Sequence, residues 1–251
     1  MSYYKEEIVS ANKIKRKTIV SLSFLLLFFA SCIATWIWIH KQPEDNGVPK
    51  PLRTVLNGNE NIFSYFFKGT NLAKIFPSSA ATVQVRVNGD AGMSSPLDTA
   101  AWKLQLVRNP GDTIYISIAE IKALPKTDVI FDFKCIEGWS QVTHWAGVKF
   151  SDFVAKYGLQ NQSKLGYTGL NTPDKEYYVG IDNRSMMHPQ TILCYELNGK
   201  PLPMDQGAPL RLIIPVKYGV KHLKRIGTMF FSDFRPKDYW FERGYDYYCG
   251  L

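Results

Sequence analysis

The first hydrophobic pattern in the chain is a continuous apolar run. The 22 residues from Thr18 to Ile39 include no charged residue. A helix of that length is about 33 Å long, which is enough to cross a hydrocarbon core of roughly 30 Å. The pattern therefore predicts a transmembrane anchor over 18–39, preceded by a basic tail over 1–17.

The flanks of the run predict its orientation. Four basic residues precede it: Lys13, Lys15, Arg16 and Lys17. Trp36 and Trp38 lie at its far end, where tryptophan anchors a helix in the membrane interface. By the positive-inside rule, the N-terminus is cytoplasmic and the chain after His40 lies on the periplasmic side of the inner membrane. Two alternatives stay open, a cleaved signal peptide and lipid attachment at Cys32 in the string FFASC.

A second composition marks the segment that follows. Residues 41–53 contain three prolines, one glycine and charges of both signs. Such a segment is typical of an extended, solvated linker, which we place at 40–54. From Val55 onward there is no second linker of this kind and no internal repeat, so we expect one domain over 55–251.

Within this domain the dominant pattern alternates apolar and polar residues, which predicts strands. Turn signals follow two of the strands, at Asn88-Gly89 and at 109–112. The predicted strands are 81–88, 102–107, 127–135, 208–216 and 225–234.

Helical signals are fewer. Ser117 and Glu120 have the spacing of a capping box in front of a short helix over 118–124. A second short helix is expected near 148–158, capped by Ser151 and stopped by Gly158. The predicted fold class is therefore α+β, mostly β, behind one N-terminal transmembrane helix.

Composition and charge exclude two broad classes. With 45% hydrophobic and 14% aromatic residues, the chain is not globally disordered. Of the net charge of +8, residues 1–41 carry +4, which leaves +4 over the other 210 residues. A mildly basic domain without a concentrated basic stripe does not predict nucleic-acid binding.

The four cysteines are Cys32, Cys135, Cys194 and Cys249, and none has the spacing of a structural zinc site. Cys194 and Cys249 are either a disulfide pair in an oxidising compartment or two buried thiols. Cys135 stands at the end of a predicted strand, where a cysteine is usually a small core residue.

The context of Cys135 changes that interpretation. Residues 133–150, FKCIEGWSQVTHWAGVKF, resemble the cofactor-ligating segment of the sulfite oxidase family of molybdopterin enzymes, and in particular its bacterial methionine-sulfoxide reductase branch. The shared strings are C-x-E-x-W-S and, seven residues later, W-x-G. Further segments follow in the order of that family: 187–191, 197–202, 207–211 and 215–224.

The resemblance implies a sulfite-oxidase-type domain that binds Mo-molybdopterin, with the Cys135 thiolate as a molybdenum ligand. A soft thiolate suits such a metal, and a strand end can aim it. Arg211 and Lys224, with the backbone N–H groups of His222 and Leu223, are the implied contacts of the phosphate and pterin. Without the resemblance, Lys217, Lys221 and Lys224 would be typical of a solvated face.

Other implied pterin contacts come from three further segments. The N-terminal segment contributes Asn61, followed by Ser64 and Tyr65. A short loop before Pro173 contributes Thr168 or Gly169. Gln206 stands where the family has asparagine or histidine.

Glu137 bears on the substrate. No arginine follows Cys135 in the string CIEGW, and a carboxylate beside the metal disfavours an anionic substrate such as sulfite. The favoured activity is therefore reduction of a sulfoxide or similar small oxide, with Cys135 and Glu137 as catalytic residues. Two alternatives stay open: oxidation of a small sulfur compound such as sulfite, and a non-catalytic partner module.

The anchor also bears on the partner and on export. Electrons are expected from a membrane-bound donor, a haem or quinol-linked protein. Folded molybdopterin enzymes usually cross the membrane behind a twin-arginine signal, but the string from Lys13 to Lys17 contains no arginine pair.

Overall fold

The structure, a computed structural model, describes residues 10–250. The chain divides into two compact units, one ending at Thr54 and the other beginning at Val55. The second unit contains most of the strands and both cavities considered below.

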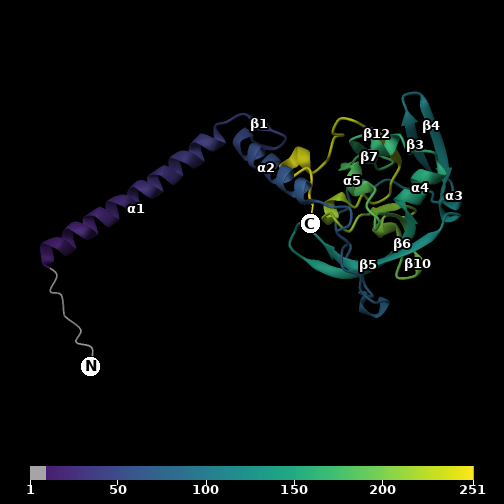
Figure 1. Cartoon of the computed structure of the whole chain (residues 1–251), viewed down its shortest axis with the longest axis horizontal. Helices are drawn as coiled ribbons and strands as arrows, with labels where there is room; N and C mark the ends of the chain where they lie inside the picture. Colours follow the sequence, from purple (N-terminus) through teal and green to yellow (C-terminus); the bar gives the residue numbers. More distant parts are fainter. Residues whose placement is uncertain (1–9, 251) are drawn as a thin grey trace. The chain divides into compact units, whose positions relative to one another are not determined.

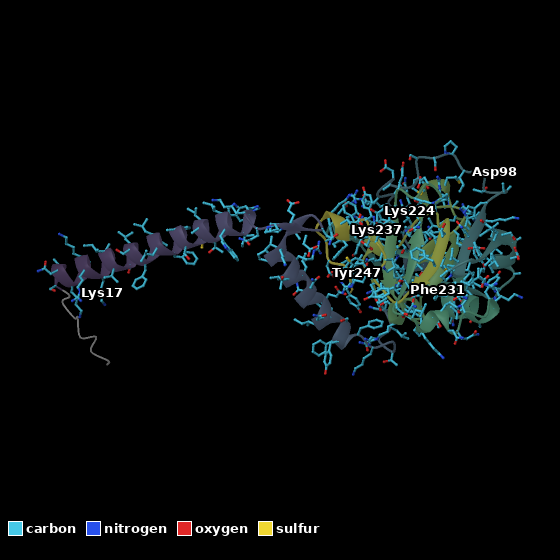
Figure 2. All side chains as sticks on the ribbon, turned by 90° about the horizontal axis from the view of Figure 1, so that it is seen from above. Lys17, Asp98, Lys224, Phe231, Lys237 and Tyr247 are labelled. Carbon is cyan, nitrogen blue, oxygen red and sulfur yellow. The ribbon has the colours of Figure 1, made fainter. Side chains whose placement is uncertain are left out.

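The first unit consists mainly of the helix α1 (Ala11–His40), whose N-terminus is capped by the Ser10 side chain. None of its residues is buried, and its side chains project outward along its length (Figure 2). The helix is long and apolar enough to cross a membrane. This unit is therefore suited to membrane association, as the apolar run predicted.

The segment expected to be an extended linker is ordered instead. It forms the hairpin β1 (Glu44–Asp45) and β2 (Val48–Pro49), which turns at Asn46 and Gly47 with positive φ angles of 49° and 80°. The helix α2 (Lys50–Phe66) follows at once and contains the boundary between the units. Proline in the first helical turn lacks an N–H that would be unsatisfied there anyway, so Pro51 is compatible with this helix.

The second unit is built mainly from strands. Besides the part of α2 after Thr54, its α-helices are α3 (Ile118–Lys122), α4 (Phe150–Lys156) and α5 (Asn183–Met186). Its strands are β3 (Lys103–Asn109), β4 (Asp112–Ser117), β5 (Lys126–Lys134), β6 (Ser140–Lys149), β7 (Tyr167–Asn171), β8 (Tyr178–Asp182), β9 (Ile192–Leu197), β10 (Lys200–Pro201), β11 (Arg211–Ile213) and β12 (Thr228–Ser232). The predicted mostly-β α+β class is confirmed.

These strands form two five-stranded sheets (Figure 1). The first has the order β10-β9-β6-β5, with β11 also paired to β9, and the second has the order β4-β3-β12-β7-β8. Neighbours are antiparallel except β3 and β12, which are parallel. The β5–β6 hairpin and β11 belong to the same sheet, which brings the sequence around Cys135 and Arg211 to one side of the domain.

The short helices are fixed to the domain by side chains that they bury in its hydrophobic core. Phe150 and Phe153 of α4 and Ile121 of α3 are fully buried in one cluster with Leu104 and Leu106 of β3. Each such side chain stabilises the fold by roughly 1.5 to 3 kcal/mol through burial. The apolar positions of these elements therefore have the role that the sequence pattern assigned to them.

Two local predictions need correction. Residues 81–88 alternate like a strand but lie in a loop, with bends at 81, 83 and 84, that joins no sheet. The helix over 150–156 is entered from Lys149, so Ser151 lies inside it and does not cap it. In contrast, the Ser117–Glu120 capping box is present with both of its reciprocal hydrogen bonds.

Candidate functional site

The β5–β6 hairpin presents Cys135 at the first position after β5. The Cys135 N–H donates to the Trp139 carbonyl (2.9 Å), and the Gly138 N–H donates to the Cys135 carbonyl (3.1 Å). Gly138 has a φ of 88°, a conformation that glycine adopts at little cost. The tight turn fixes the Cys135 thiol at the end of a rigid strand and leaves Glu137 at the tip.

Cys135 lines a cavity of about 370 Å³, which we call the site cavity. Most of its wall comes from the loop over 85–91, the β5–β6 hairpin, β11 and the segment over 219–224. Its lining residues include Val85, Arg86, Asn88, Gly89, Asp90, Ala91, Phe133, Cys135, Ile136, Glu137, Trp139, Gln141, Trp145, Tyr177, Gln206, Arg211, Gly219, Val220, His222, Lys224, Tyr239, Trp240 and Tyr245.

Two donors hold Glu137 beside Cys135. Trp139 Nε1 donates to the Glu137 carboxylate at 3.1 Å, and Asn88 Nδ2 donates to the same oxygen at 3.2 Å. These two hydrogen bonds lower the pKa of Glu137, so it is a carboxylate at neutral pH. Asn88 Nδ2 also lies 3.8 Å from the Cys135 sulfur. One amide thus contacts both expected catalytic side chains.

Arg211 places a positive charge in the wall of the site cavity. It is 3% exposed, stacks over the Trp145 ring at 4.5 Å, and donates to the Gln206 backbone and side-chain oxygens at 2.9 and 3.0 Å. No carboxylate within residues 10–250 forms an ion pair with it, and its Nε lacks a hydrogen-bond partner. Burial lowers the pKa of Arg211 to about 10, which leaves it charged.

A second buried arginine gives a useful contrast. Arg225 is 4% exposed, donates to the Met93 and Ser95 carbonyls, and lines neither cavity of the domain. Neither arginine forms an ion pair with a carboxylate within residues 10–250, but only Arg211 lines a cavity in which a ligand could lie against it. A buried charge without a counter-ion is costly, so this position suits an anionic ligand group.

His222 supplies a different polar group. It is 3% exposed, and burial, with the charge of Arg211, lowers its pKa to about 3, so the imidazole is neutral. Its Nε2 lies 3.1 Å from the Lys217 carbonyl, which only accepts, so Nε2 carries the proton. Nδ1 is left as an acceptor and has no partner within the described residues. It is available to a ligand N–H group.

Lys224 and Gln206 hold the loop over 85–91 against the site cavity. Lys224 Nζ donates to the carbonyls of Asn88 and Gly89, both at 2.9 Å, and to that of Asp205. Gln206 Nε2 donates to the carbonyls of Val85 and Arg86 at 3.4 and 3.3 Å. These contacts position Asn88 over Cys135.

The site cavity fits a molybdopterin. Cys135 offers a soft ligand, Arg211 offers an unneutralised charge for a phosphate, and His222 offers an acceptor for a heterocyclic N–H. No three His, Cys, Asp or Glu side chains gather as a metal site anywhere in residues 10–250. A metal held by Cys135 would therefore take its other ligands from a cofactor.

Several expected pterin contacts lie elsewhere. Asn61 and Ser64 sit on α2 and line the other cavity, while Tyr65 is 80% exposed and lines neither. The expected loop is a helix, which explains their displacement. Thr168 and Gly169 lie inside β7, where Thr168 donates to Asn183 and Gly169 packs against the Phe230 ring. None of these five residues lines the site cavity.

The basic segment over 217–224 also differs from expectation. The N–H groups of His222 and Leu223 donate to the carbonyls of Gly219 and Lys221, and Leu223 is a core residue. Lys217 and Lys221 are each 2% exposed, so they form no solvated face. Of the three lysines, only Lys224 lines the site cavity.

Sequence reasoning missed two parts of the site cavity. One is Asn88, which we assigned to a turn because it precedes glycine. The other is an aromatic wall formed by Tyr177, Tyr239, Trp240 and Tyr245, in which neighbouring rings lie 4.9 to 5.3 Å apart. The density of aromatic residues over 239–248 was the available signal.

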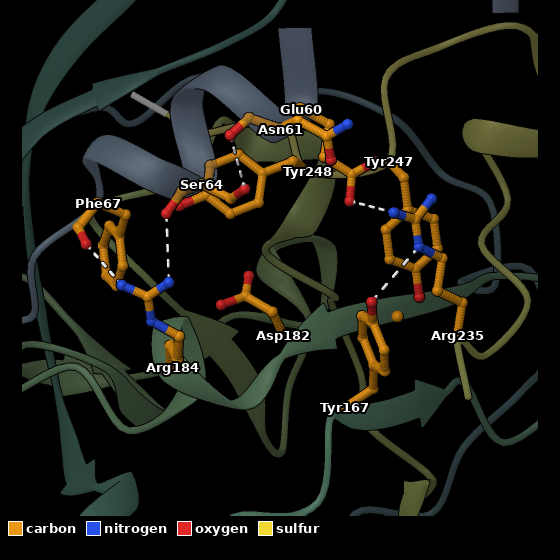
Figure 3. A pocket seen from close by; sticks show the side chains of 11 residues that line it. Glu60, Asn61, Ser64, Phe67, Tyr167, Asp182, Arg184, Arg235, Tyr247 and Tyr248 are labelled. Carbon is orange, nitrogen blue, oxygen red and sulfur yellow. Dashed lines mark hydrogen bonds and ion pairs between the residues drawn. The ribbon is translucent and has the colours of Figure 1, made fainter. Parts of the chain in front are cut away.

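The other cavity, about 220 Å³, is the Asp182 cavity; it is lined by Glu60, Asn61, Ser64, Phe67, Tyr167, Gly180, Asp182, Arg184, Arg235, Tyr247 and Tyr248. Figure 3 shows the Asp182 carboxylate among side chains from α2 and the C-terminal segment. Arg184 donates to the Ser64 and Phe67 carbonyls, and Arg235 forms an ion pair with Glu60. These contacts fasten α2 to the domain.

All four cysteines are free thiols in the structure, so Cys194 and Cys249 form no disulfide. Both are buried, and burial raises the pKa of each thiol to about 12. Of the two expectations for this pair, the structure has two buried thiols.

Comparison with known sequences gives one family. The family model described as "Oxidoreductase molybdopterin binding domain" matches residues 91–240. A putative protein-methionine-sulfoxide reductase subunit YedZ1 from Azospira oryzae is 31% identical over 82% of this chain and 79% of its own length. The protein-methionine-sulfoxide reductase catalytic subunit MsrP from Xanthomonas axonopodis is 33% identical over 48% of this chain, which spans 41% of that relative.

A solved structure shares the fold. The sulfane dehydrogenase SoxCD from Paracoccus pantotrophus matches with a TM-score of 0.50 and 15% identity. The match covers 66% of this chain and 46% of that one. It supports the sulfite-oxidase-type architecture that the resemblance implied.

Proposed function

From the premise that this chain belongs to the oxidoreductase family defined by the molybdopterin-binding domain, we propose that it reduces a sulfoxide or a similar small neutral oxide with Mo-molybdopterin. The single observation that carries this proposal is the pairing of a buried cavity thiol, Cys135, with the ionised, hydrogen-bonded Glu137.

The cofactor, when bound, supplies oxygen-atom-transfer chemistry that protein side chains lack. Cys135 would hold the molybdenum as a thiolate, and Arg211 would bind the phosphate of the cofactor. His222 Nδ1 would accept from the pterin. Asn88, placed by Lys224, orients Glu137 and donates toward the Cys135 sulfur.

The cavity wall favours a neutral substrate with apolar flanks. Glu137 repels an oxyanion such as sulfite through its negative charge. Tyr177, Tyr239, Trp240 and Tyr245 present aromatic surface, which makes favourable contacts with a thioether sulfur and its methyl groups. The names of the relatives in the methionine-sulfoxide reductase branch agree with this class.

The reaction needs protons and electrons as well as a site. The sulfoxide oxygen leaves as water, which requires two protons and two electrons. Because Glu137 is a carboxylate at neutral pH, its role is to hold charge and to orient the site, and the protons come from solvent. The electrons come from a membrane-bound donor, a haem or quinol-linked protein, in the membrane that holds α1.

We place the domain on the periplasmic side of the inner membrane. The four basic residues lie at the N-terminal end of α1, and this end is cytoplasmic under the positive-inside rule. Protease added to spheroplasts, in which the outer membrane is opened and the cytoplasmic membrane is intact, should then degrade residues after His40. Protection until the cytoplasmic membrane is permeabilised would reverse the orientation.

The function itself is tested on the purified full chain. We expect about one molybdenum per chain, reduction of methionine sulfoxide by an artificial electron donor, and little oxidation of sulfite by an artificial acceptor. Molybdenum without sulfoxide reduction but with sulfite oxidation would favour oxidation of a small sulfur compound. Absence of molybdenum from protein made in cofactor-replete cells would favour a non-catalytic module.

A further inference from the structure

The helix α2 is amphipathic in the reverse sense to a usual surface helix. Its polar side faces the domain: Glu60 is 7% exposed and pairs with Arg235, and Ser64 lines the Asp182 cavity. Figure 3 shows Glu60, Asn61 and Ser64 around that cavity. A surface helix of a globular protein normally turns its apolar stripe toward the core.

The apolar stripe of α2 faces outward. Its members after Thr54, which we call the outward face, are Val55, Ile62, Phe63 and Phe66, and they are 55 to 68% exposed. These residues fall at helical spacing on one side, and Tyr65 beside them is 80% exposed. A contiguous exposed apolar face on a soluble domain marks a surface that meets something apolar.

We propose that the outward face of α2 lies in the interfacial region of the bilayer that holds α1, so that the domain rests on the membrane surface. This inference depends on the anchoring role of α1 and is independent of the reaction.

The length of the tether favours the bilayer as the occupant. Nine residues, 41–49, separate the end of α1 from the start of α2. A fully extended segment of this length spans about 30 Å at most. A helix held so close to a bilayer meets its surface far more often than it meets a freely diffusing partner.

Charge complementarity also favours the bilayer as the occupant of the outward face. Residues 61–88, from the end of α2 through the following loop, contain no Asp or Glu and three basic residues, Lys68, Lys74 and Arg86. Lys68 and Lys74 are exposed. Juxtamembrane basic residues are attracted to anionic lipid headgroups, and phenylalanine and tyrosine beside them are typical of helices that lie in the interface.

The test uses the full chain in vesicles of phosphatidylethanolamine and phosphatidylglycerol that contain no other protein. A nitroxide is attached at F66C or, separately, at I62C, in a C32A background. The same label at Y115C, on β4 and 62% exposed, is the matched control, and the C32A parent gives the background from Cys135. Collisions with oxygen, which concentrates in lipid, are compared with collisions with a water-soluble nickel chelate.

We expect oxygen to dominate at positions 62 and 66 and the nickel chelate to dominate at 115. Adding K68E and K74E, or replacing phosphatidylglycerol by a zwitterionic lipid, should raise nickel access at position 66. Nickel access at positions 62 and 66 equal to that at 115 would overturn the proposal. Spin–spin broadening that disappears on dilution with unlabelled protein would also overturn it, since a second copy of the chain would then cover the outward face. Protection from nickel seen only in native membranes would overturn it as well, since a protein partner would then cover that face.

Discussion

The site cavity and the Asp182 cavity differ in how nearby buried charges are compensated. Beside the Asp182 cavity, Lys217 lies 2.9 Å from Asp182, and Lys221 lies 2.5 Å from Asp238. In the site cavity, Arg211 is as deeply buried but has no carboxylate partner within residues 10–250. A buried ion needs a counter-ion because it has lost its hydration. Lys217 and Lys221 have counter-ions within the protein, whereas Arg211 would gain one only from an anionic ligand.

The charged neighbours of Asp182 and Glu60 also shift the pKa values of these two carboxylates. Burial opposes the ionised form of Asp182, but the charge and hydrogen bond of Lys217, together with hydrogen bonds from Ser185, outweigh it and lower the pKa of Asp182. Glu60 shows the reverse balance, because burial, with the charge of Asp246, raises its pKa more than Arg235 and Lys217 lower it. In the site cavity no carboxylate among residues 10–250 offsets the burial of Arg211. This difference distinguishes a ligand-binding site from a structural network of ion pairs.

The largest expected effect comes from removing the thiolate. In C135S the hydroxyl has nearly the shape of the thiol, so the fold should persist, but a harder and less acidic ligand cannot replace the thiolate–metal bond. We expect the cofactor to be retained, the electronic spectrum of the metal to change, and sulfoxide reduction to be lost. C194S and C249S, at buried thiols outside the site cavity, are the matched controls and should keep the native spectrum. Full activity of C135S with native charge-transfer bands would contradict the ligand assignment.

The next effect tests the comparison of the cavities directly. K221M leaves Asp238 buried and unpaired, so we expect the free energy of unfolding to fall by about 3 to 5 kcal/mol. R211M removes a charge that has no internal partner, so the cofactor-free protein should keep its stability within about 1 kcal/mol. Chemical denaturation of the two cofactor-free variants measures this difference.

Cofactor content should show the opposite order. R211M should lose most of its molybdopterin, and K221M should retain it at temperatures where it stays folded. Equal destabilisation of the two cofactor-free variants, with equal cofactor content, would remove the distinction between the cavities.

The parts of the fold that the sequence predicted are those decided locally. The alternation over 102–107 and 127–135 became β3 and β5, and the capping box at Ser117 and Glu120 formed as spaced. Alternation was misleading at 81–88, because the alternating pattern does not show whether another strand is there to pair with the segment. The helix α2 was missed because Pro49, just before it, and Pro51, in its first turn, favour a linker, although proline is tolerated in a first helical turn.

The site was predictable to the extent that it lies in one continuous motif. Cys135 and Glu137 come from a single hairpin, and Arg211 and Lys224 line the same cavity as they do. The burial of Lys217 and Lys221 was not predictable, because Asp182 and Asp238 are distant in sequence and carry no pairing signal. Asn88 was missed for the same reason, since only the folded loop brings it to Cys135.

A smaller effect should appear in the pH dependence of stability. Burial, with the charge of Arg211, lowers the pKa of Lys224 to about 8, below its ordinary value of 10.5. Between these values the unfolded chain holds a proton that the folded chain has lost, so this group makes stability rise with pH, by no more than about 1.4 kcal/mol per pH unit. The comparison of wild type with K224M isolates Lys224, because the other titrating groups are common to both. In denaturation of the cofactor-free proteins between pH 8 and 10, the stability of wild type relative to K224M should rise, and a constant difference would contradict the shifted pKa.

The smallest expected effect is on charge selectivity at the site cavity. E137Q keeps the size of the side chain and its oxygen acceptor but removes a negative charge that is present at neutral pH. Since Glu137 is exposed and partly screened by solvent, we expect only a roughly two- to tenfold gain in affinity for anions such as sulfite, with little change in kcat/KM for a neutral sulfoxide. D90N, which removes a second carboxylate from the same lining, is the matched control for charge alone. The gain should shrink as salt is added, and inhibition constants for sulfite at low and high ionic strength measure it. A large loss of kcat for the sulfoxide in E137Q, without a change in anion affinity, would instead assign proton transfer to Glu137.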